Sequence, residues 1–201
     1  AATMPKFRLA LQADAPVDAD CSDPTLADGL ATPNVGENAF RIARDRVDRV
    51  VEVSEDEISL AILRMIEREK AVVEGAAATT LAALMSGKLD ELAGRRVVLT
   101  LCGGNIDPTI LDRVIERGLV ADGRLSRFTA TISDRPGGLA RLASVLAECG
   151  ASVKQLTHDR VFCGPDVAEV DVLCVIETRD HDHLRQVHDH LRGAGIRFGV
   201  R

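Results

Sequence analysis

The spacing of hydrophobic positions changes along the chain, and the first clear pattern is helical. After Ser54, apolar residues recur with the spacing of one helix face, as Ile58, Ala61, Ile62, Met65 and Ile66. Ser54 and Glu57 have the spacing of a capping box, in which each side chain accepts a hydrogen bond from the other residue's backbone N–H. The pattern therefore predicts a helix that begins at Glu55.

Three further helices are predicted in the first 120 residues, and the turn-rich segment 18–33 is predicted to be loop. The helices cover about residues 7–15, 76–86 and 107–118. In the last of them, Asp107 and Pro108 supply a cap and a first-turn proline. A continuous apolar run over 96–101 has the pattern of a central parallel strand and leads directly into Cys-Gly-Gly-Asn. Strand, glycine loop and helix together predict a ligand-binding geometry, because ligands of open α/β sheets lie beyond the carboxyl ends of strands.

The second half of the chain follows a different order: strand, helix, strand, strand, helix, strand. The predicted strands cover 128–133, 151–157, 167–177 and 195–200, and the helices cover 139–148 and 182–192. This order is the ferredoxin-like βαββαβ arrangement, whose sheet has helices on one face only. We expect the bare face to pair with a second copy. The polar segment 121–126 is the predicted linker between a first domain, 1–120, and a second domain, 127–201.

Composition narrows the functional classes. The chain has 25 Lys and Arg against 31 Asp and Glu, and no basic run supplies the attraction that a nucleic acid needs. The longest weakly polar stretch, 75–85, is too short to cross a bilayer, and no apolar leader opens the chain. We therefore expect a cytoplasmic protein with neither a nucleic-acid nor a membrane partner.

Five cysteines are present, namely Cys21, Cys102, Cys149, Cys163 and Cys174. An odd number without C-x-x-C spacing argues against a disulfide framework and against a zinc knuckle. Most are predicted to be reduced core thiols. With no Trp, no Tyr and five Phe, the core is predicted to be aliphatic.

Several longer motifs occur together. They are ADGLA from Ala27, VDRVVEVSEDEI from Val47, VVEGAAATTLAALMSGKL from Val72, VVLTLCGGNID from Val97 and ATISDRPGGLARLASVLAECGASV from Ala130. The first four resemble the closing part of the catalytic domain of the fold-type II, pyridoxal-phosphate-dependent threonine and serine dehydratases, a family that includes serine racemase. The last resembles an ACT domain, a small regulatory module that binds amino acids. The resemblance covers nearly the whole chain and implies an α/β fold in two parts.

The resemblance implies a threonine or serine ammonia-lyase, which uses pyridoxal 5′-phosphate to convert the amino acid into a 2-oxo acid and ammonia by β-elimination. Amino-acid metabolism follows as the setting, with isoleucine biosynthesis among the possibilities. The implied partners are an amino-acid substrate, an amino-acid effector, and further copies of the chain joined through ACT domains. The alternative is a non-catalytic regulatory or assembly subunit that keeps the catalytic remnant only as a platform for ACT pairing.

Two parts of the family's cofactor site do not occur in the sequence. They are the Ser-x-Lys-x-Arg-Gly motif, whose lysine holds the cofactor as a Schiff base, and the tetraglycine phosphate loop. The four lysines, Lys6, Lys70, Lys88 and Lys154, lie in other contexts. We therefore expect the C-terminal portion of a longer enzyme, which packs on a missing N-terminal catalytic half that carries the Schiff-base lysine, and which is inactive alone.

Cys102 matches the family position at which Ser or Cys faces the pyridine nitrogen of the cofactor. A neutral thiol there does not hold that nitrogen protonated, which in this family suits β-elimination. The alternative interpretation is an ordinary buried cysteine at the end of a strand.

The resemblance assigns five more residues to the cofactor site. They are Gly103, Gly104 and Asn105 in the turn, Gly29 within ADGLA, and Glu74 at the family's Glu-Pro or Glu-Gly position. Each also has a simpler interpretation, because turn glycines serve positive φ angles and an acidic residue favours a helix start.

The predicted effector loop lies between the first strand and helix of the ACT-like half. Its residues are Asp134, Pro136, Gly137, Gly138 and Leu139. In ACT domains this loop binds an amino acid, and backbone N–H groups at a helix start can receive its carboxylate. The alternative is that the loop only shapes a turn. If ligand backbone approaches Gly138, the change Gly138→Leu is expected to fill that space and leave the fold intact.

No metal site is predicted. Some family members bind a divalent cation near the sequence aligned with 1–7, where this chain has MPKF and no acid. The helix over 182–192 puts the histidine pair His181 and His188 on one side and the pair His183 and His190 about 160° away. All four cannot converge on one ion, and we predict that they lie on a solvated face.

Overall fold

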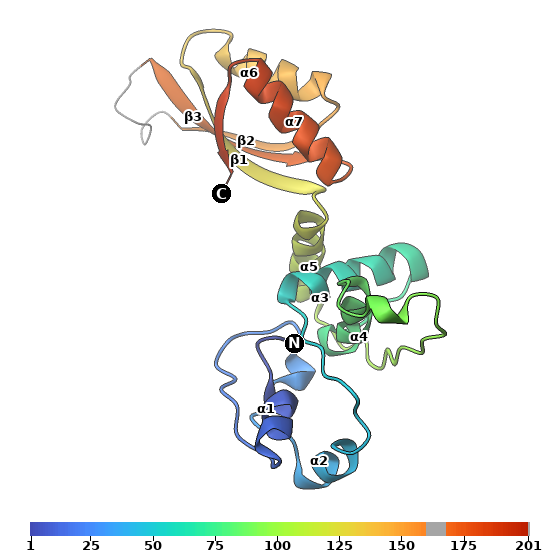
Figure 1. Ribbon diagram of the computed structural model, residues 1–201. Helices are drawn as coiled ribbons and strands as arrows, with labels where there is room; N and C mark the ends of the chain where they lie inside the picture. Colours follow the sequence, from blue (N-terminus) through green and yellow to red (C-terminus); the bar gives the residue numbers. More distant parts are fainter. Residues whose placement is uncertain (160–167, 201) are drawn as a thin grey trace. The chain divides into compact units, whose positions relative to one another are not determined.

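The computed structural model describes residues 1–159 and 168–200, and the chain divides into two compact units, Ala1–Ala121 and Asp122–Arg201 (Figure 1). The helical segments of the first unit are α1 (Lys6–Ala13), η1 (Asp28–Leu30), α2 (Glu37–Ala43), α3 (Glu55–Arg64), η2 (Met65–Glu69), α4 (Gly75–Met85), η3 (Asp90–Leu92) and α5 (Pro108–Ala121). The second unit contains β1 (Leu125–Ser133), α6 (Gly138–Glu148), β2 (Ser152–Asp159), β3 (Glu169–Glu177), α7 (His181–Gly193) and β4 (Arg197–Val200).

Helix α3 begins at Glu55, as predicted, because the capping box forms. The Ser54 Oγ accepts a hydrogen bond from the Glu57 N–H at 3.3 Å, and a Glu57 carboxylate oxygen accepts one from the Ser54 N–H at 2.7 Å. Past Arg64 the helix continues as the single π-helical turn η2, which ends at Glu69 and is capped by Lys70 with φ of 55°.

The core of the first unit lies between α3, α4 and α5. Its buried members include Ile58, Ala61, Ile62, Met65, Ala77, Ala78, Ala82 and Val114, so the predicted stripe of α3 is confirmed. At the α3–α5 contact a Cβ on Gly118 would lie 2.9 Å from the Ser59 carbonyl oxygen, so the missing side chain lets the two helices approach closely.

The predicted strand over 96–101 is wrong. This segment has no strand partner in the first unit, all of whose residues the structure describes, and Val98 is 92% exposed. A strand needs a neighbour to accept and donate its ladder hydrogen bonds, and an apolar run by itself does not supply one. The helix after Asp107 also runs further than predicted, to Ala121.

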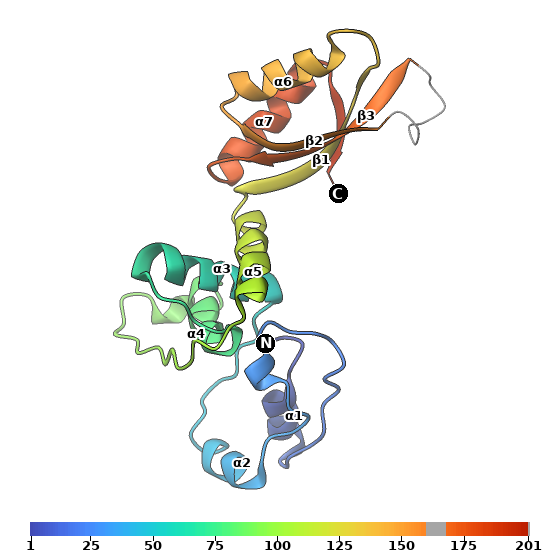
Figure 2. The same cartoon turned by 180° about the vertical axis from the view of Figure 1, so that it is seen from behind.

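The second unit has the predicted ferredoxin-like topology. Its four strands are antiparallel in the order β2-β3-β1-β4, and α6 and α7 both lie on one face of the sheet (Figures 1 and 2). Strands β1 and β3 pair over their full length, from Leu125 opposite Glu177 to Ser133 opposite Glu169. The strand β1 starts inside the predicted linker 121–126, and Val167, the predicted start of the third strand, lies outside the described residues.

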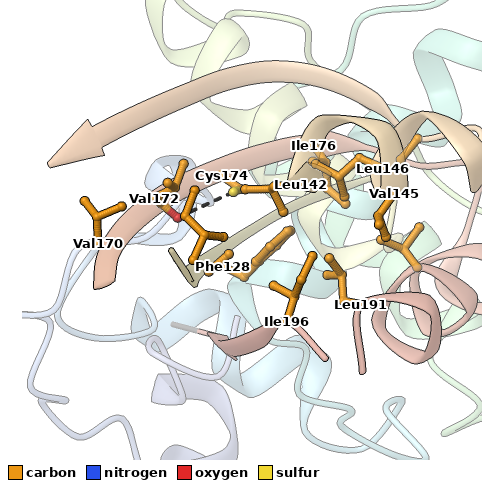
Figure 3. Close-up of a cluster of buried hydrophobic side chains, with 14 residues drawn as sticks. Phe128, Leu142, Val145, Leu146, Val170, Val172, Cys174, Ile176, Leu191 and Ile196 are labelled. Atoms are coloured by element: carbon orange, nitrogen blue, oxygen red, sulfur yellow. Dashed lines mark hydrogen bonds between the residues drawn. The ribbon is translucent and has the colours of Figure 1, made fainter. Parts of the chain in front are cut away.

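Alternating burial along β3 builds the core of the second unit. Val170, Val172, Cys174 and Ile176 all point toward the helices and are buried (Figure 3). They pack with Phe128 of β1 and with residues of the two helices that include Leu142, Leu146, Val187 and Leu191. Apart from Phe128 and Cys174, the buried residues of this core are aliphatic, in agreement with the composition.

Within the described ranges 1–159 and 168–200, no helix is both long and apolar enough to span a membrane.

Candidate functional sites

Glu74 lies at the centre of the residues that the resemblance assigned to the cofactor. It is the N-terminal cap of α4 and has extended backbone, with φ of −74° and ψ of 162°. Its backbone N–H donates to the Gly103 carbonyl at 3.2 Å, and its carboxylate accepts from the Asn105 N–H at 3.3 Å. The fold therefore brings the start of α4 against the turn 103–105, although about 30 residues separate them in the sequence.

The two glycines of this turn are required by close approach. Gly103 has φ of 111°, and a Cβ there would lie 2.6 Å from the Glu74 carboxyl group. A Cβ on Gly104 would lie 3.0 Å from the Val72 carbonyl oxygen. The turn thus presents backbone without side chains at both positions.

Gly29 also lies near this carboxylate. A Cβ on Gly29 would lie 3.2 Å from the Ala76 Cβ and 3.7 Å from a Glu74 carboxylate oxygen. Close packing continues at Gly75, where a Cβ would lie 1.9 Å from the Leu26 carbonyl oxygen. The ADGLA loop is therefore pressed against the start of α4, and Gly29, Glu74 and the turn 103–105 form one cluster.

The predictions missed Glu55, which holds this loop. Its carboxylate accepts hydrogen bonds from the Thr25 hydroxyl and from the Leu26 N–H, both at 2.7 Å. The only signal in the sequence is an acidic residue at the start of a capped helix, which by itself indicates a favourable helix terminus and not a contact with a distant loop.

Cys102 is exposed and does not follow a buried strand, so the interpretation as an ordinary buried cysteine is wrong. Cys102 directly precedes the Gly103–Asn105 turn, so its backbone leads into the cluster around Glu74. The site therefore has a solvent-exposed cysteine next to backbone that carries no side chains at 103 and 104.

A cavity of about 510 Å³ opens beside the cluster in the first unit. Its charged lining residues are Asp28, Glu55, Glu74, Asp107, Arg113 and Arg117, and Leu26, Ile106, Ile110 and Val114 supply apolar surface. Arg117 is held by an ion pair of 2.7 Å with Asp56. Sequence reasoning did not find the arginines, which lie on an exposed face of an amphipathic helix.

None of the three lysines in the first unit is directed at the cluster. Lys6 donates to the Leu30 carbonyl at 2.7 Å and to the Thr32 hydroxyl, Lys70 donates to the Glu67 carbonyl at 2.6 Å, and Lys88 binds the Glu57 carboxylate at 2.7 Å. Glycine backbone and a neutral thiol fit the ring face of pyridoxal phosphate. The same cluster contains no amine for its aldehyde.

In the second unit, the loop between β1 and α6 borders a cavity of about 230 Å³. The predicted residues Asp134, Pro136, Gly137 and Leu139 line it, together with His158 of β2, which the sequence did not reveal. The His158 Nε2 lies 3.8 Å from an Asp134 carboxylate oxygen. The pairing of β2 with β3 brings this histidine to the loop, and no sequence spacing encodes that.

Gly138 does not line the cavity. A Cβ there would lie 2.1 Å from the Ser133 carbonyl oxygen, and the Gly138 N–H already donates to the Arg135 carbonyl at 3.0 Å. The expectation that Gly138→Leu leaves the fold intact is therefore wrong, because the backbone at Ser133 already occupies the space that a side chain at 138 would need. A ligand carboxylate at this helix start would have to use the N–H groups that follow Gly138.

The predicted solvated histidine face is wrong for two residues. His183 is 2% exposed, and its Nδ1 accepts from the Arg179 N–H at 3.1 Å while Nε2 lies 2.8 Å from the Cys149 carbonyl oxygen. Such bonding requires the neutral tautomer protonated on Nε2. His188 packs against Phe128 and Phe198, at ring-centroid distances of 6.2 and 4.9 Å. Among the described residues, no group of three or more His, Cys, Asp or Glu is placed to hold a metal ion.

The described cysteines are free thiols, but only Cys174 is buried; Cys21 and Cys149 are half-buried. The prediction that most are core thiols is therefore wrong for the described residues. Cys163 lies outside them.

Comparison with known proteins identifies the first unit. The family model described as "pyridoxal-phosphate dependent enzyme" matches residues 1–103, just over half of the chain. The chain therefore belongs to the pyridoxal-phosphate-dependent enzyme family, as its motifs predicted, and the family's cofactor is pyridoxal phosphate.

Individual relatives are more specific. An L-threonine ammonia-lyase of Geobacter sulfurreducens is 46% identical over 176 residues, which are 88% of this chain and 44% of that protein. Another from Thermotoga maritima is 38% identical over 177 residues, with the same shares. Among solved structures, the processed form of threonine deaminase isoform 2 from Solanum lycopersicum matches with a TM-score of 0.53 and 27% identity, over 57% of this chain and 32% of that one. The predicted resemblance to the fold-type II threonine dehydratases is thus confirmed, and the chain spans less than half the length of these curated relatives.

Proposed function

We propose that this chain is part of a threonine ammonia-lyase and supplies the face of its cofactor site that contacts the pyridine ring. The observation that carries the proposal is the cluster of Gly29, Glu74 and the turn 103–105, which directly follows the exposed Cys102 in the chain. The 46% identity to an L-threonine ammonia-lyase supports threonine over serine as the substrate.

Each part of the cluster has a defined task in this proposal. When bound, pyridoxal phosphate supplies an electron sink for loss of the amino acid's Cα proton and β-hydroxyl group. The Cys102 thiol would lie against the ring nitrogen, and a neutral thiol leaves that nitrogen without a proton. The bare backbone at 103 and 104 would let the ring approach closely, and Gly29 would lie against its face.

The amine that binds the cofactor must come from another part of the enzyme, because the lysines of the first unit are held elsewhere. We therefore expect the 201-residue chain to be inactive alone. The same observation favours a second candidate, a non-catalytic subunit that assembles through its second unit.

Complementation separates the two candidates. The chain is co-expressed with the N-terminal part of the Geobacter sulfurreducens relative that it does not match, and 2-oxo acid and ammonia are measured with L-threonine and with L-serine. We expect activity only in the complemented sample. The Cys102→Ser variant should keep most of this activity. The Cys102→Asp variant should impair elimination, because a carboxylate holds the ring nitrogen protonated. A complemented sample with intact assembly and no activity would favour the non-catalytic subunit, and equal rates for the Asp variant and the parent would reject the role of Cys102.

The second unit is proposed to be an ACT domain that binds a small amino acid at the cavity between the β1–α6 loop and His158. The cavity of about 230 Å³ suits an aliphatic or hydroxyl side chain next to Leu139 and Pro136. The Asp134 carboxylate is the group that would attract the ligand's ammonium ion. Isoleucine, valine, threonine and serine are the candidate effectors.

Calorimetry of the full chain against these four amino acids tests the effector site. We expect heat with at least one of them at millimolar concentration, and loss of that heat in Leu139→Phe, which fills the cavity. Val153→Phe is the control, because Val153 is comparably exposed, at 40% against 39% for Leu139, and does not line the cavity. No heat with any of the four would remove the effector site from the proposal.

A further inference from the structure

We infer that Glu74 is a positioning residue, which holds the turn 103–105 and thereby Cys102 in place without itself contacting the cofactor. This inference rests on the proposed function for the role of Cys102. The hold on the turn can be measured in the chain alone.

The first support is that one residue binds both ends of the turn. The backbone N–H of Glu74 donates to the Gly103 carbonyl at 3.2 Å, and the Asn105 N–H donates to the Glu74 carboxylate at 3.3 Å. A hydrogen bond to a charged acceptor is stronger than one between neutral groups. The residue after Cys102 and the third residue after it are therefore both tied to the start of α4.

The second support is the position of the carboxylate under the turn. A Cβ on Gly103 would lie 2.6 Å from the Glu74 Cδ and Oε1 and 2.8 Å from Oε2, so the carboxyl group occupies the space of a side chain at 103. Contact on this side and a positive φ at Gly103 together define where the turn can lie.

The third support is that no sheet holds Cys102. The segment 96–101 before it has no strand partner within the first unit, and residues 102–105 are exposed. Within the first unit, the turn is instead held by its hydrogen bonds to Glu74 at Gly103 and Asn105, and the Ile106 N–H donates to the Gly104 carbonyl at 3.0 Å.

A role as a positioning residue predicts a specific response to substitution. Gln keeps an acceptor oxygen for the Asn105 N–H, whereas Ala removes it. In the 201-residue chain we expect Glu74→Ala to raise the exchange rate of the Asn105 amide by about tenfold, the effect of one lost hydrogen bond, and Glu74→Gln to stay within about threefold of the parent. Glu69→Ala, at an exposed glutamate of the same unit, is the matched control.

A double-mutant cycle adds an independent test. Gly103→Ala is expected to increase the exchange rate of the Asn105 amide, because its Cβ collides with the Glu74 carboxyl group and its φ is strained. In the Glu74→Ala background the collision disappears and only the strain is left, so the increase caused by Gly103→Ala should be smaller. Additive effects of the two changes, or an unchanged rate in Glu74→Ala, would overturn the inference.

Activity of the complemented enzyme then separates this inference from the proposed function. If Glu74 positions the turn, the Glu74→Gln variant retains elimination activity, and the Glu74→Ala variant loses activity through a lower kcat. If Glu74→Gln is as inactive as Glu74→Ala while its Asn105 amide exchanges like the parent's, Glu74 acts by its charge on the bound molecules and the inference fails. If the parent itself is inactive while the exchange rates behave as expected, the proposed function fails and the positioning of the turn stands.

Discussion

The Nε2 of His188 is buried and has no hydrogen-bond partner among the residues that the structure describes. Its ring packs against the rings of Phe128 and Phe198. Burial lowers the pKa of His188 below its ordinary value, and the nearby Arg192 lowers the pKa further, against a smaller opposite effect of Asp189. The neutral imidazole is therefore the form that fits the folded second unit.

The pKa of His188 gives a pH dependence of stability with a definite sign. Because the folded-state pKa is below the unfolded-state value of about 6.5, the unfolded chain takes up the proton first as the pH falls. The contribution to the free energy of unfolding is complete above about pH 6.5 and decreases below it until the folded-state pKa is reached. We expect thermal unfolding followed by circular dichroism to show a smaller loss of stability between about pH 7.5 and pH 5.5 in His188→Leu than in the parent.

The control for this prediction is His190→Leu. His190 is exposed on the same helix, with its Nδ1 2.9 Å from the Gln186 carbonyl oxygen. It should leave the pH dependence close to that of the parent. If the His188→Leu variant keeps the pH dependence of the parent, the assignment of this dependence to His188 is contradicted.

The cysteines differ in reactivity for physical reasons that belong to single residues. Burial raises the pKa of the Cys174 thiol to about 12, and its Sγ donates to the Val172 carbonyl at 3.4 Å (Figure 3). The thiolate is the reactive form, so at about pH 8 Cys174 should resist alkylation until the second unit unfolds, while the exposed Cys102 reacts. Mass spectrometry of alkylated peptides, in buffer and in denaturant, checks this, and rapid labelling of Cys174 in buffer would show that its environment is not closed.

At the scale of the secondary-structure elements, the capping box of α3 is the clearest local determinant. Besides its contact with the Ser54 N–H, the Glu57 carboxylate binds Lys88 at 2.7 Å, so the helix start also anchors the segment after α4. Ser54→Ala should lower the free energy of unfolding by about 1 kcal/mol, the usual cost of losing an N-cap acceptor. Denaturant unfolding measures the change, and Ser22→Ala, in an exposed loop, is the control. Equal stability of the parent and Ser54→Ala would mean that the first turn does not depend on the cap.

The start of helix α6 depends on close contact between the backbone at Gly138 and the backbone at Ser133. Since a Cβ there would lie 2.1 Å from the Ser133 carbonyl oxygen, Gly138→Ala should already destabilise the second unit strongly, by the order of 1–3 kcal/mol expected of overpacking. Circular dichroism and amide exchange of β3 would show the loss. Gly193→Ala is the control, because nothing lies within 4 Å of a Cβ at that position. A Gly138→Ala variant as stable as Gly193→Ala would show that the loop can shift.

For the whole molecule, two separate cores define two units. The core of the second unit joins the sheet to α6 and α7, and its buried members among the described residues all belong to that unit, from Phe128 to Ile196. A fragment of residues 122–201 is therefore expected to fold by itself and to self-associate through the sheet face that no helix of its own covers. Circular dichroism tests folding, and sedimentation tests association against the complete chain. An unfolded fragment would show that the first unit is needed for its stability, and a strictly monomeric one would remove the expected pairing.

Much of the candidate site could be inferred from motifs, but its arrangement could not. The sequence singled out Gly29, Glu74 and the Cys102–Asn105 turn because their neighbours resemble a known family. The contact between the Glu74 carboxylate and this turn depends on the packing of the start of α4 against the turn, which the sequence does not reveal. Glu55 and His158 were missed for the same reason, since each meets its site through contacts that no local spacing records.

The sequence by itself determined features that depend on neighbouring residues. Periodicity and capping gave helix α3, and alternation gave the βαββαβ order, because hydrogen bonds within a turn and the side-chain period of a strand are local properties. Tertiary structure decided the features that need a distant partner. The run 96–101 is apolar enough for a strand but has no neighbouring strand in its unit. His183 bonds to the turn before α7, and His188 packs against Phe198 of β4. Gly138 has no room for a side chain because the backbone of Ser133 lies there.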